Sequence, residues 1–133
     1  MTELKHGRGY VYDLQYHVVW CVKYRRKVLV DKVEQDFKGI IRELCERYEI
    51  GILEMETDRD YVHLLISCKP QHYIPTFVKA LKGQSARMLF KIHPELKNAL
   101  WGGHLWNPSY FITTVSENTQ EQVRNYIQNQ QEK

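Results

Sequence analysis

The sequence has few residues that break or cross-link a chain, with seven glycines, four prolines and three cysteines among 133 residues. This scarcity, with 43% hydrophobic residues, argues against a disordered or low-complexity chain. Cys21, Cys45 and Cys68 are far apart and form no closely spaced pair, which argues against a disulfide framework or a zinc knuckle. Isolated cysteines are typical of a reducing compartment, so we expect a cytoplasmic protein.

Long hydrophobic runs are also missing. No stretch of 18 apolar residues is present, so the sequence predicts no transmembrane helix and no membrane partner. Residues 1–9 are polar and lack the apolar core of a secretory signal. The length suits one domain with a substantial core, and we expect residues 1–133 to form it.

The formal net charge of +3 is small, but the basic residues are unevenly distributed. Residues 23–27 read Lys-Tyr-Arg-Arg-Lys, and the chain contains nine tyrosines. Cations beside aromatic rings suit single-stranded nucleic acid, because cations contact phosphates and rings stack on bases. A solvated basic turn near core tyrosines would give the same composition, so both interpretations stay open at this level.

Hydrophobic periodicity predicts seven elements. Alternating residues predict strands over 10–22, 50–57, 61–68 and 110–115, and helical spacing predicts helices over 33–48, 74–91 and about 119–131. The first six elements follow the β-α-β-β-α-β order of a ferredoxin-like α+β fold, in which two helices cover one face of an antiparallel sheet. We expect a site on the other, open face, with the additional C-terminal helix contributing to it.

Three residues are candidates for chemistry. His63 alternates with Val62 and Leu64, which we expect to face the helices, so its imidazole should lie on the open face. Tyr126 and Gln130 are four residues apart and share one face of the terminal helix. Each signal alone is weak, because a lone strand histidine is usually structural and this helical pair is common by chance.

Together these features resemble the single-tyrosine transposases of small bacterial insertion sequences, the TnpA-type members of the HUH nuclease superfamily. The matching stretches span nearly the whole chain: 16–27 (YHVVWCVKYRRK), 60–65 (DYVHLL), 77–83 (FVKALKG), 105–110 (LWNPSY) and 126–130 (YIQNQ). The first and last stretches are the most specific in combination.

The resemblance implies an enzyme that cleaves and rejoins single-stranded DNA at the ends of a mobile element and recognises DNA hairpins there. Tyr126 matches the nucleophile, which attacks a backbone phosphate and leaves a 5′-phosphotyrosine link and a free 3′-hydroxyl. The resemblance also implies a homodimer, in which the terminal helix can present its tyrosine to the metal site of either subunit.

The family holds a divalent metal ion, Mg²⁺ or Mn²⁺, with two histidines that flank one hydrophobic residue, and with a polar side chain near the nucleophile. His63 matches the second histidine and Gln130 matches the polar ligand, but Tyr61 stands at the position of the first histidine. Because a neutral phenol is a poor ligand for these ions, we expect weak metal binding.

Three interpretations of Tyr61 stay open: the enzyme is impaired, it is active with water or Asp60 completing the metal shell, or Tyr61 is itself a nucleophile. His17, on the polar face of the first strand, is the next candidate ligand. The alternative function is therefore a domesticated or catalytically impaired protein that binds hairpin DNA. An RNA-binding module is a third alternative, disfavoured because the aromatic RNP1 pattern is absent.

The candidate DNA contacts are basic side chains in the loop after the first strand, namely Lys23, Arg25, Arg26 and Lys27. Lys79 and Lys82, about one turn apart on the second helix, are further candidates. Both groups could instead be solubilising charge. Trp106 and Tyr110 could stack on bases or pack in the core.

Overall fold

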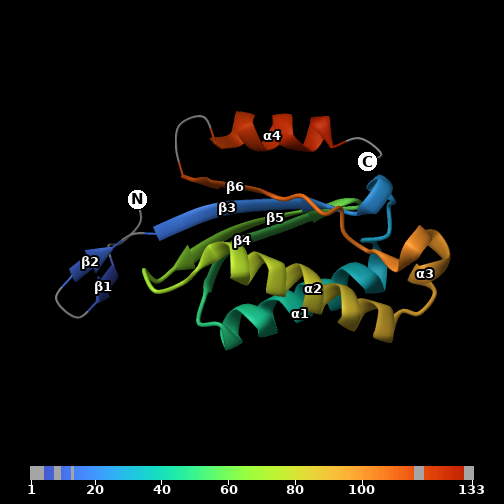
Figure 1. The fold of residues 1–133 in the computed structure, drawn as a ribbon, viewed down its shortest axis with the longest axis horizontal. Helices are drawn as coiled ribbons and strands as arrows, with labels where there is room; N and C mark the ends of the chain where they lie inside the picture. Colours follow the sequence, from blue (N-terminus) through green and yellow to red (C-terminus); the bar gives the residue numbers. More distant parts are fainter. Residues whose placement is uncertain (1–4, 8–9, 13, 116–118, 131–133) are drawn as a thin grey trace.

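The computed structural model describes residues 5–7, 10–12, 14–115 and 119–130. Its centre is a four-stranded antiparallel sheet with the strand order β4-β5-β3-β6 (Figure 1). The strands are β3 (Leu14–Cys21), β4 (Gly51–Asp58), β5 (Tyr61–Cys68) and β6 (Phe111–Thr114). This is the ferredoxin-like strand order, so the predicted α+β fold is confirmed.

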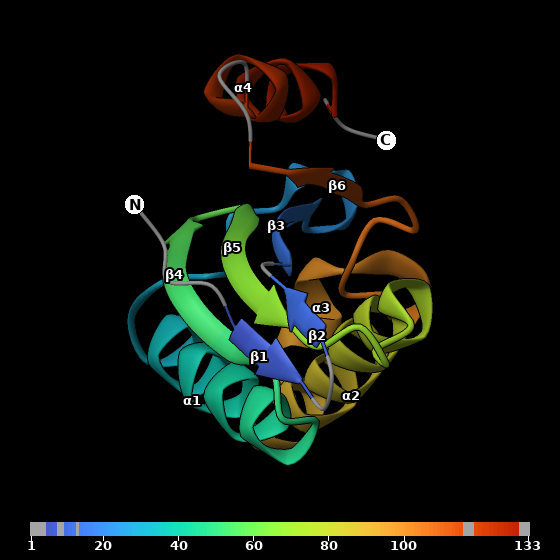
Figure 2. The same cartoon turned by 90° about the vertical axis from the view of Figure 1, so that its left-hand side faces the viewer.

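Helices lie on both faces of this sheet. α1 (Asp31–Arg47) and α2 (Ile74–Ile92) lie side by side on one face, and α4 (Thr119–Asn129) lies on the other (Figures 1 and 2). The main core lies between the sheet and the first two helices, where Val62 and Leu64 of β5 are fully buried. Their burial confirms the predicted helix-facing side of this strand.

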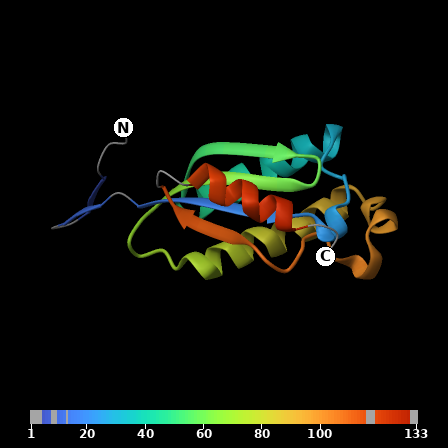
Figure 3. The same ribbon diagram turned by 90° about the horizontal axis from the view of Figure 1, so that it is seen from above.

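The face that the sequence predicted to be open is partly covered. α4 lies above β3 and β6, as Figure 3 shows from above. Val19 and Cys21 are fully buried, although alternation places them on the opposite side of β3 from the core residues Val18 and Trp20. The face that the first six elements leave open is therefore covered in part by the additional C-terminal helix, and burial on both sides explains the continuous apolar run at the end of β3.

The N-terminal strand prediction also differs from the structure. β1 (Lys5–Gly7) and β2 (Tyr10–Tyr12) form a separate two-stranded sheet, with Lys5 opposite Tyr12, and β3 begins at Leu14. Alternation identified extended backbone over residues 10–12 correctly, but it does not tell which strand such a segment pairs with. A single strand over 10–22 is therefore wrong.

The segment between α2 and β6, predicted to be irregular, contains the short helices α3 (Leu96–Ala99) and η2 (Trp101–Gly103). Trp106, which follows them, belongs to the core. Its ring makes edge contacts with Trp20 and Phe37, and its indole N–H donates to Ser85 Oγ at 3.1 Å. Of the two interpretations of Trp106, the structure supports packing.

None of the helices in the described part of the chain is long and apolar enough to cross a membrane.

Candidate active site

α4 places Tyr126 above the edge strand β6. The Tyr126 ring stacks on Phe111, with 5.5 Å between ring centroids, and its hydroxyl lies 2.7 Å from the hydroxyl of Ser109. Burial raises the pKa of Tyr126, and the hydrogen bond with Ser109 acts in the opposite direction. Tyr126 is therefore a protonated, half-buried phenol at neutral pH, held on two sides.

Ser109 connects the two candidate residues of α4. Its hydroxyl lies 2.7 Å from Tyr126 Oη and 3.3 Å from Gln130 Oε1. The Oδ1 atom of Asn107 accepts from both the backbone N–H and the hydroxyl of Ser109, each at 3.1 Å. Sequence reasoning missed Ser109, because asparagine, proline and serine together indicate only a turn.

Lys82 reaches this turn from α2. Its ammonium group donates to the carbonyl oxygens of Asn107 and Ser109, both at 2.8 Å, and lies 5.7 Å from the ring centre of Tyr110. Burial lowers the pKa of Lys82 to about 8. Lys82 therefore holds the turn that carries Ser109.

His63 lies on the α4 side of β5 and pairs with a second histidine. Nδ1 of His17 is 2.7 Å from Nε2 of His63, and the other ring nitrogen of His63 is 3.8 Å from the Glu56 carboxylate on β4. Burial lowers the pKa of both imidazoles, and Glu56 opposes this effect at His63. The polar face of β3 thus brings His17 directly to the predicted site.

The metal set that the resemblance implies lacks one imidazole, because Tyr61 stands two residues before His63 on β5. Burial raises the pKa of the Tyr61 phenol, and the nearby Asp58 and Glu56 carboxylates add to this, so Tyr61 is a neutral and weak ligand. Among the described residues, no hydrogen bond joins His63 to Gln130, whose side-chain oxygen accepts from Ser109.

The acidic and imidazole side chains lead to the same conclusion. No cluster of three or more histidine, cysteine, aspartate or glutamate side chains suitable for a metal ion occurs in the described part of the chain. Of the ligands that the resemblance implies, the chain therefore offers His63 and Gln130 but no first histidine, and we derive no chemical step through a metal.

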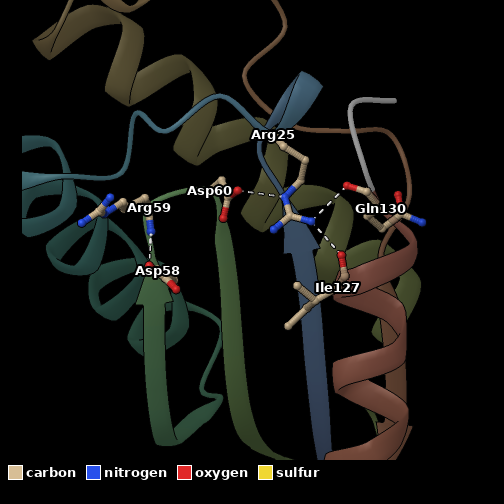
Figure 4. A network of polar contacts seen from close by, with 6 residues as sticks. All are labelled: Arg25, Asp58, Arg59, Asp60, Ile127 and Gln130. Atoms are coloured by element: carbon tan, nitrogen blue, oxygen red, sulfur yellow. Dashed lines mark hydrogen bonds and ion pairs between the residues drawn. The ribbon is translucent and has the colours of Figure 1, made fainter.

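The basic loop contributes to the site through Arg25. η1 (Lys23–Arg25) has left-handed backbone at Tyr24 and Arg25, with φ of 59° and 54°. The Arg25 guanidinium donates to Asp60 Oδ2 at 3.0 Å and to the carbonyl oxygens of Ile127 at 2.7 Å and Gln130 at 3.1 Å (Figure 4). Arg25 therefore ties the end of α4 to the start of β5.

The other predicted DNA contacts lie in different environments. Arg26, Lys27 and Lys79 are exposed, whereas Lys23 lies 5.1 Å from the ring centre of Tyr24. An open hollow of about 670 Å³ lies beside the loop and is lined by Tyr24, Arg25, Arg26, Lys27, Asp60, Ile127 and Gln128. The exposed cations can meet a phosphate, while Arg25 and Lys82 make bonds within the protein.

Comparison with known proteins decides the family. A family model described as "Transposase IS200 like" matches residues 10–130. The chain belongs to the IS200-like transposase family. The resemblance noted in the sequence is therefore confirmed.

Relatives of this IS200-like transposase cover most of its length. It is 55% identical over 131 residues to ISDra2 transposase TnpA of Deinococcus radiodurans, covering 98% of this chain and 94% of the relative. It is 32% identical over 121 residues to the transposase for insertion sequence element IS200 of Salmonella typhimurium, covering 91% of this chain and 79% of the relative.

Two solved structures share the fold of this IS200-like transposase. A crystal structure of a Deinococcus radiodurans R1 protein assigned as a transposase has a TM-score of 0.92 and 52% identity, covering 97% of this chain and 99% of that one. A REP-associated tyrosine transposase bound to a REP hairpin has a TM-score of 0.61 and 13% identity, covering 98% and 75%. At that identity, the second similarity concerns the fold alone.

Proposed function

We propose that this IS200-like transposase cleaves and rejoins single-stranded DNA at insertion-sequence ends, with Tyr126 as the nucleophile. The observation that carries the proposal is the placement of the Tyr126 phenol, which is fixed by Ser109 and Phe111 on the sheet face that also carries His63. The hairpin bound by the REP-associated relative supports a DNA hairpin as the partner.

The chemistry needs no external energy source. The Tyr126 oxygen forms a bond to phosphorus, the bond from phosphorus to the 3′-oxygen breaks, the phenol loses its proton and the released 3′-oxygen gains one. The bond energy is kept in the 5′-phosphotyrosine ester, which a second 3′-hydroxyl attacks to rejoin a strand. Because burial raises the pKa of Tyr126, the phenol starts protonated at neutral pH and has to lose its proton in the course of the reaction.

The exposed cations suit the DNA backbone. Arg26 and Lys27, beside the open hollow near the end of α4, and Lys79 on α2 are free to contact phosphates. Lys23 extends the same basic surface. Arg25 and Lys82 act on DNA indirectly in this proposal, by holding α4 and the Ser109 turn.

Two further features are part of the proposal. A divalent ion, Mg²⁺ or Mn²⁺, binds weakly to His63 and Gln130, because Tyr61 replaces an imidazole. The protein acts as a homodimer, as its resemblance to TnpA-type enzymes implies. Sedimentation of the full chain with and without hairpin DNA measures its oligomeric state directly.

The decisive test is formation of a covalent protein–DNA adduct. The probe is a labelled single strand that carries the hairpin end of the host insertion sequence, incubated with Mn²⁺ and resolved on a denaturing gel. Tyr126→Phe removes one oxygen and should abolish the adduct while leaving hairpin affinity unchanged. Tyr61→Phe is the matched variant and should keep the adduct. An adduct that persists in Tyr126→Phe and disappears in Tyr61→Phe would identify Tyr61 as the nucleophile.

A second candidate function is a hairpin DNA-binding protein without cleavage. The neutral Tyr61 phenol in place of a metal ligand favours it. Tight hairpin binding with no adduct at any Mn²⁺ concentration would support this function over transposition.

A further inference from the structure

We infer that Ser109 is a further catalytic residue and that Lys82 is the residue that positions it; this inference rests on the proposed role of Tyr126. Ser109 touches the oxygen that would attack phosphorus. Lys82 touches the backbone of the turn that carries Ser109.

The Ser109 hydroxyl has one proton and three acceptors within reach. These are Asn107 Oδ1 at 3.1 Å, Gln130 Oε1 at 3.3 Å and Tyr126 Oη at 2.7 Å. While Tyr126 is protonated, either hydroxyl of the pair can donate. Once the phenol loses its proton, only Ser109 can donate, so the serine proton must point at the phenolate.

This change of direction favours the reactive form of Tyr126. A hydrogen bond to an ionised oxygen is roughly twice as strong as one between neutral groups. The Ser109 proton therefore stabilises the anion more than the phenol, and it does so at the atom where negative charge develops. The same contact opposes the effect of burial on the pKa of Tyr126.

The stabilisation of the Tyr126 phenolate depends on the position of the turn that carries Ser109, and Lys82 fixes that position. Its Nζ donates to the carbonyl oxygens on both sides of Pro108, at 2.8 Å to Asn107 and 2.8 Å to Ser109. Lysine carries donors and no acceptor, so it suits two converging carbonyls. Because a neutral amine still has two N–H donors, Lys82 can hold the turn on both sides of its pKa of about 8.

A DNA-free experiment tests the contact itself. The full chain is labelled with ¹³Cζ-tyrosine, Tyr126→Phe assigns the Tyr126 signal, and the signal is followed by NMR through a pH titration. Ser109→Ala should raise the pKa of Tyr126, because the phenolate loses its donor. Lys82→Met should shift it in the same direction. Lys91→Met, which removes an exposed lysine from the same helix, should leave it unchanged.

The double variant separates positioning from simple charge. If Lys82 acts through Ser109, Lys82→Met adds nothing further to Ser109→Ala. Additive shifts would show that Lys82 acts on Tyr126 through its charge and would overturn its positioning role. An unchanged pKa in Ser109→Ala would overturn the role of Ser109.

The adduct assay then measures the effect on chemistry. Ser109→Ala should slow adduct formation on the order of tenfold or more, at unchanged hairpin affinity, because a donor to a developing anion is lost. Ser109→Thr and Lys82→Arg keep the donors and should restore most of the rate. Equal rates in Ser109→Ala and the unaltered chain would contradict the inference. If the unaltered chain forms no adduct, the proposed function fails, while the NMR result still decides the Ser109–Lys82 relationship.

Discussion

Nη1 of Arg25 lies 2.7 Å from the carbonyl oxygen of Ile127, across a separation of 102 residues. The last carbonyls of a helix have no partner within the helix, and a cation there also interacts favourably with the helix dipole. The Ile127 carbonyl also accepts from the backbone N–H of Gln130, and Arg25 donates in addition to the carbonyl of Gln130, just beyond α4, and to Asp60. The loop predicted to contact phosphates thus contains one arginine that forms hydrogen bonds within the protein and a neighbour, Arg26, that is exposed.

This difference predicts opposite behaviour for two adjacent arginines. Arg25→Ala should lower the free energy of unfolding by about 1–3 kcal/mol, because a hydrogen-bonded charge is lost and Asp60 loses its partner. Arg26→Ala should change it by less than about 0.5 kcal/mol, as an exposed substitution usually does. Urea titrations of both variants measure this, and equal destabilisation would contradict the assignment.

DNA binding should depend on the exposed cations of this loop, which contribute little to stability. Arg26→Ala and Lys27→Ala should each reduce the slope of log affinity against log salt by roughly 0.7, the value for one phosphate contact on a single strand. Filter binding or fluorescence anisotropy over a salt series gives this slope for a hairpin oligonucleotide. An unchanged slope in both variants would mean that these cations are only solvated charge.

Position 61 should control metal binding. Tyr61→His places an imidazole two residues before His63 on the same face of β5. Affinity for Mn²⁺, measured by calorimetry, should rise at least 10–100-fold. Even a side chain that only hydrogen-bonds to a metal ligand typically contributes that much to affinity or activity. Tyr61→Phe is the control and should bind as weakly as the present chain. If the histidine variant and the present chain cleave equally at low Mn²⁺, another residue completes the site, and His17 is the first to replace.

The half-buried Lys82 should make stability depend on pH in the alkaline range. Its pKa is about 8 in the folded protein against 10.5 for an unperturbed lysine, so the unfolded chain binds more protons between these values. The contribution of Lys82 to stability should therefore rise with pH from about 8 to 10.5 and stay constant below 8.

Lys82→Met isolates that contribution. The nearby Cys21 thiol, whose pKa burial raises from 9.0 to about 11, lowers stability as pH rises above 9, but this thiol is present in both proteins. Urea unfolding of both proteins at pH 7, 8, 9 and 10 gives the difference in their free energies of unfolding. As pH rises, the unaltered chain should become more stable relative to Lys82→Met. A difference that stays constant would show that Lys82 has an ordinary pKa.

Trp106 should behave as a core residue. Trp106→Ala removes a buried ring that contacts Trp20 and Phe37 and should lower the free energy of unfolding by about 3–5 kcal/mol. Trp106→Phe keeps an aromatic ring but loses the hydrogen bond from the indole N–H to Ser85, so a smaller loss of stability is expected. Chemical denaturation checks both, and a fully stable alanine variant would contradict core packing.

The sequence was most informative where one face of an element is buried. Periodicity predicted α1 and α2 to within two residues at each end, and alternation predicted β5 from Tyr61 to Cys68 as observed. It was least informative about which surfaces meet. Neither the pairing of residues 10–12 with β1 nor the burial of Val19 beneath α4 has a local signature, because both depend on contacts between distant segments.

The candidate site divides in the same way. His63, Tyr126 and Gln130 were identified because their residue types and spacing resemble a known family. The structural contacts of Lys82 and Arg25 were not foreseen, because their partners here are largely backbone carbonyls. Every residue type supplies a backbone carbonyl, so no sequence pattern predicts such a hydrogen bond.

The left-handed backbone at Tyr24 and Arg25 has a mechanical consequence. Holding a residue other than glycine in this conformation costs about 1–2 kcal/mol, and two such residues stand in succession here. The bonds from Arg25 to α4 and Asp60 offset this strain. The guanidinium that joins α4 to Asp60 thus also holds in place the backbone that leads directly to the exposed cations Arg26 and Lys27.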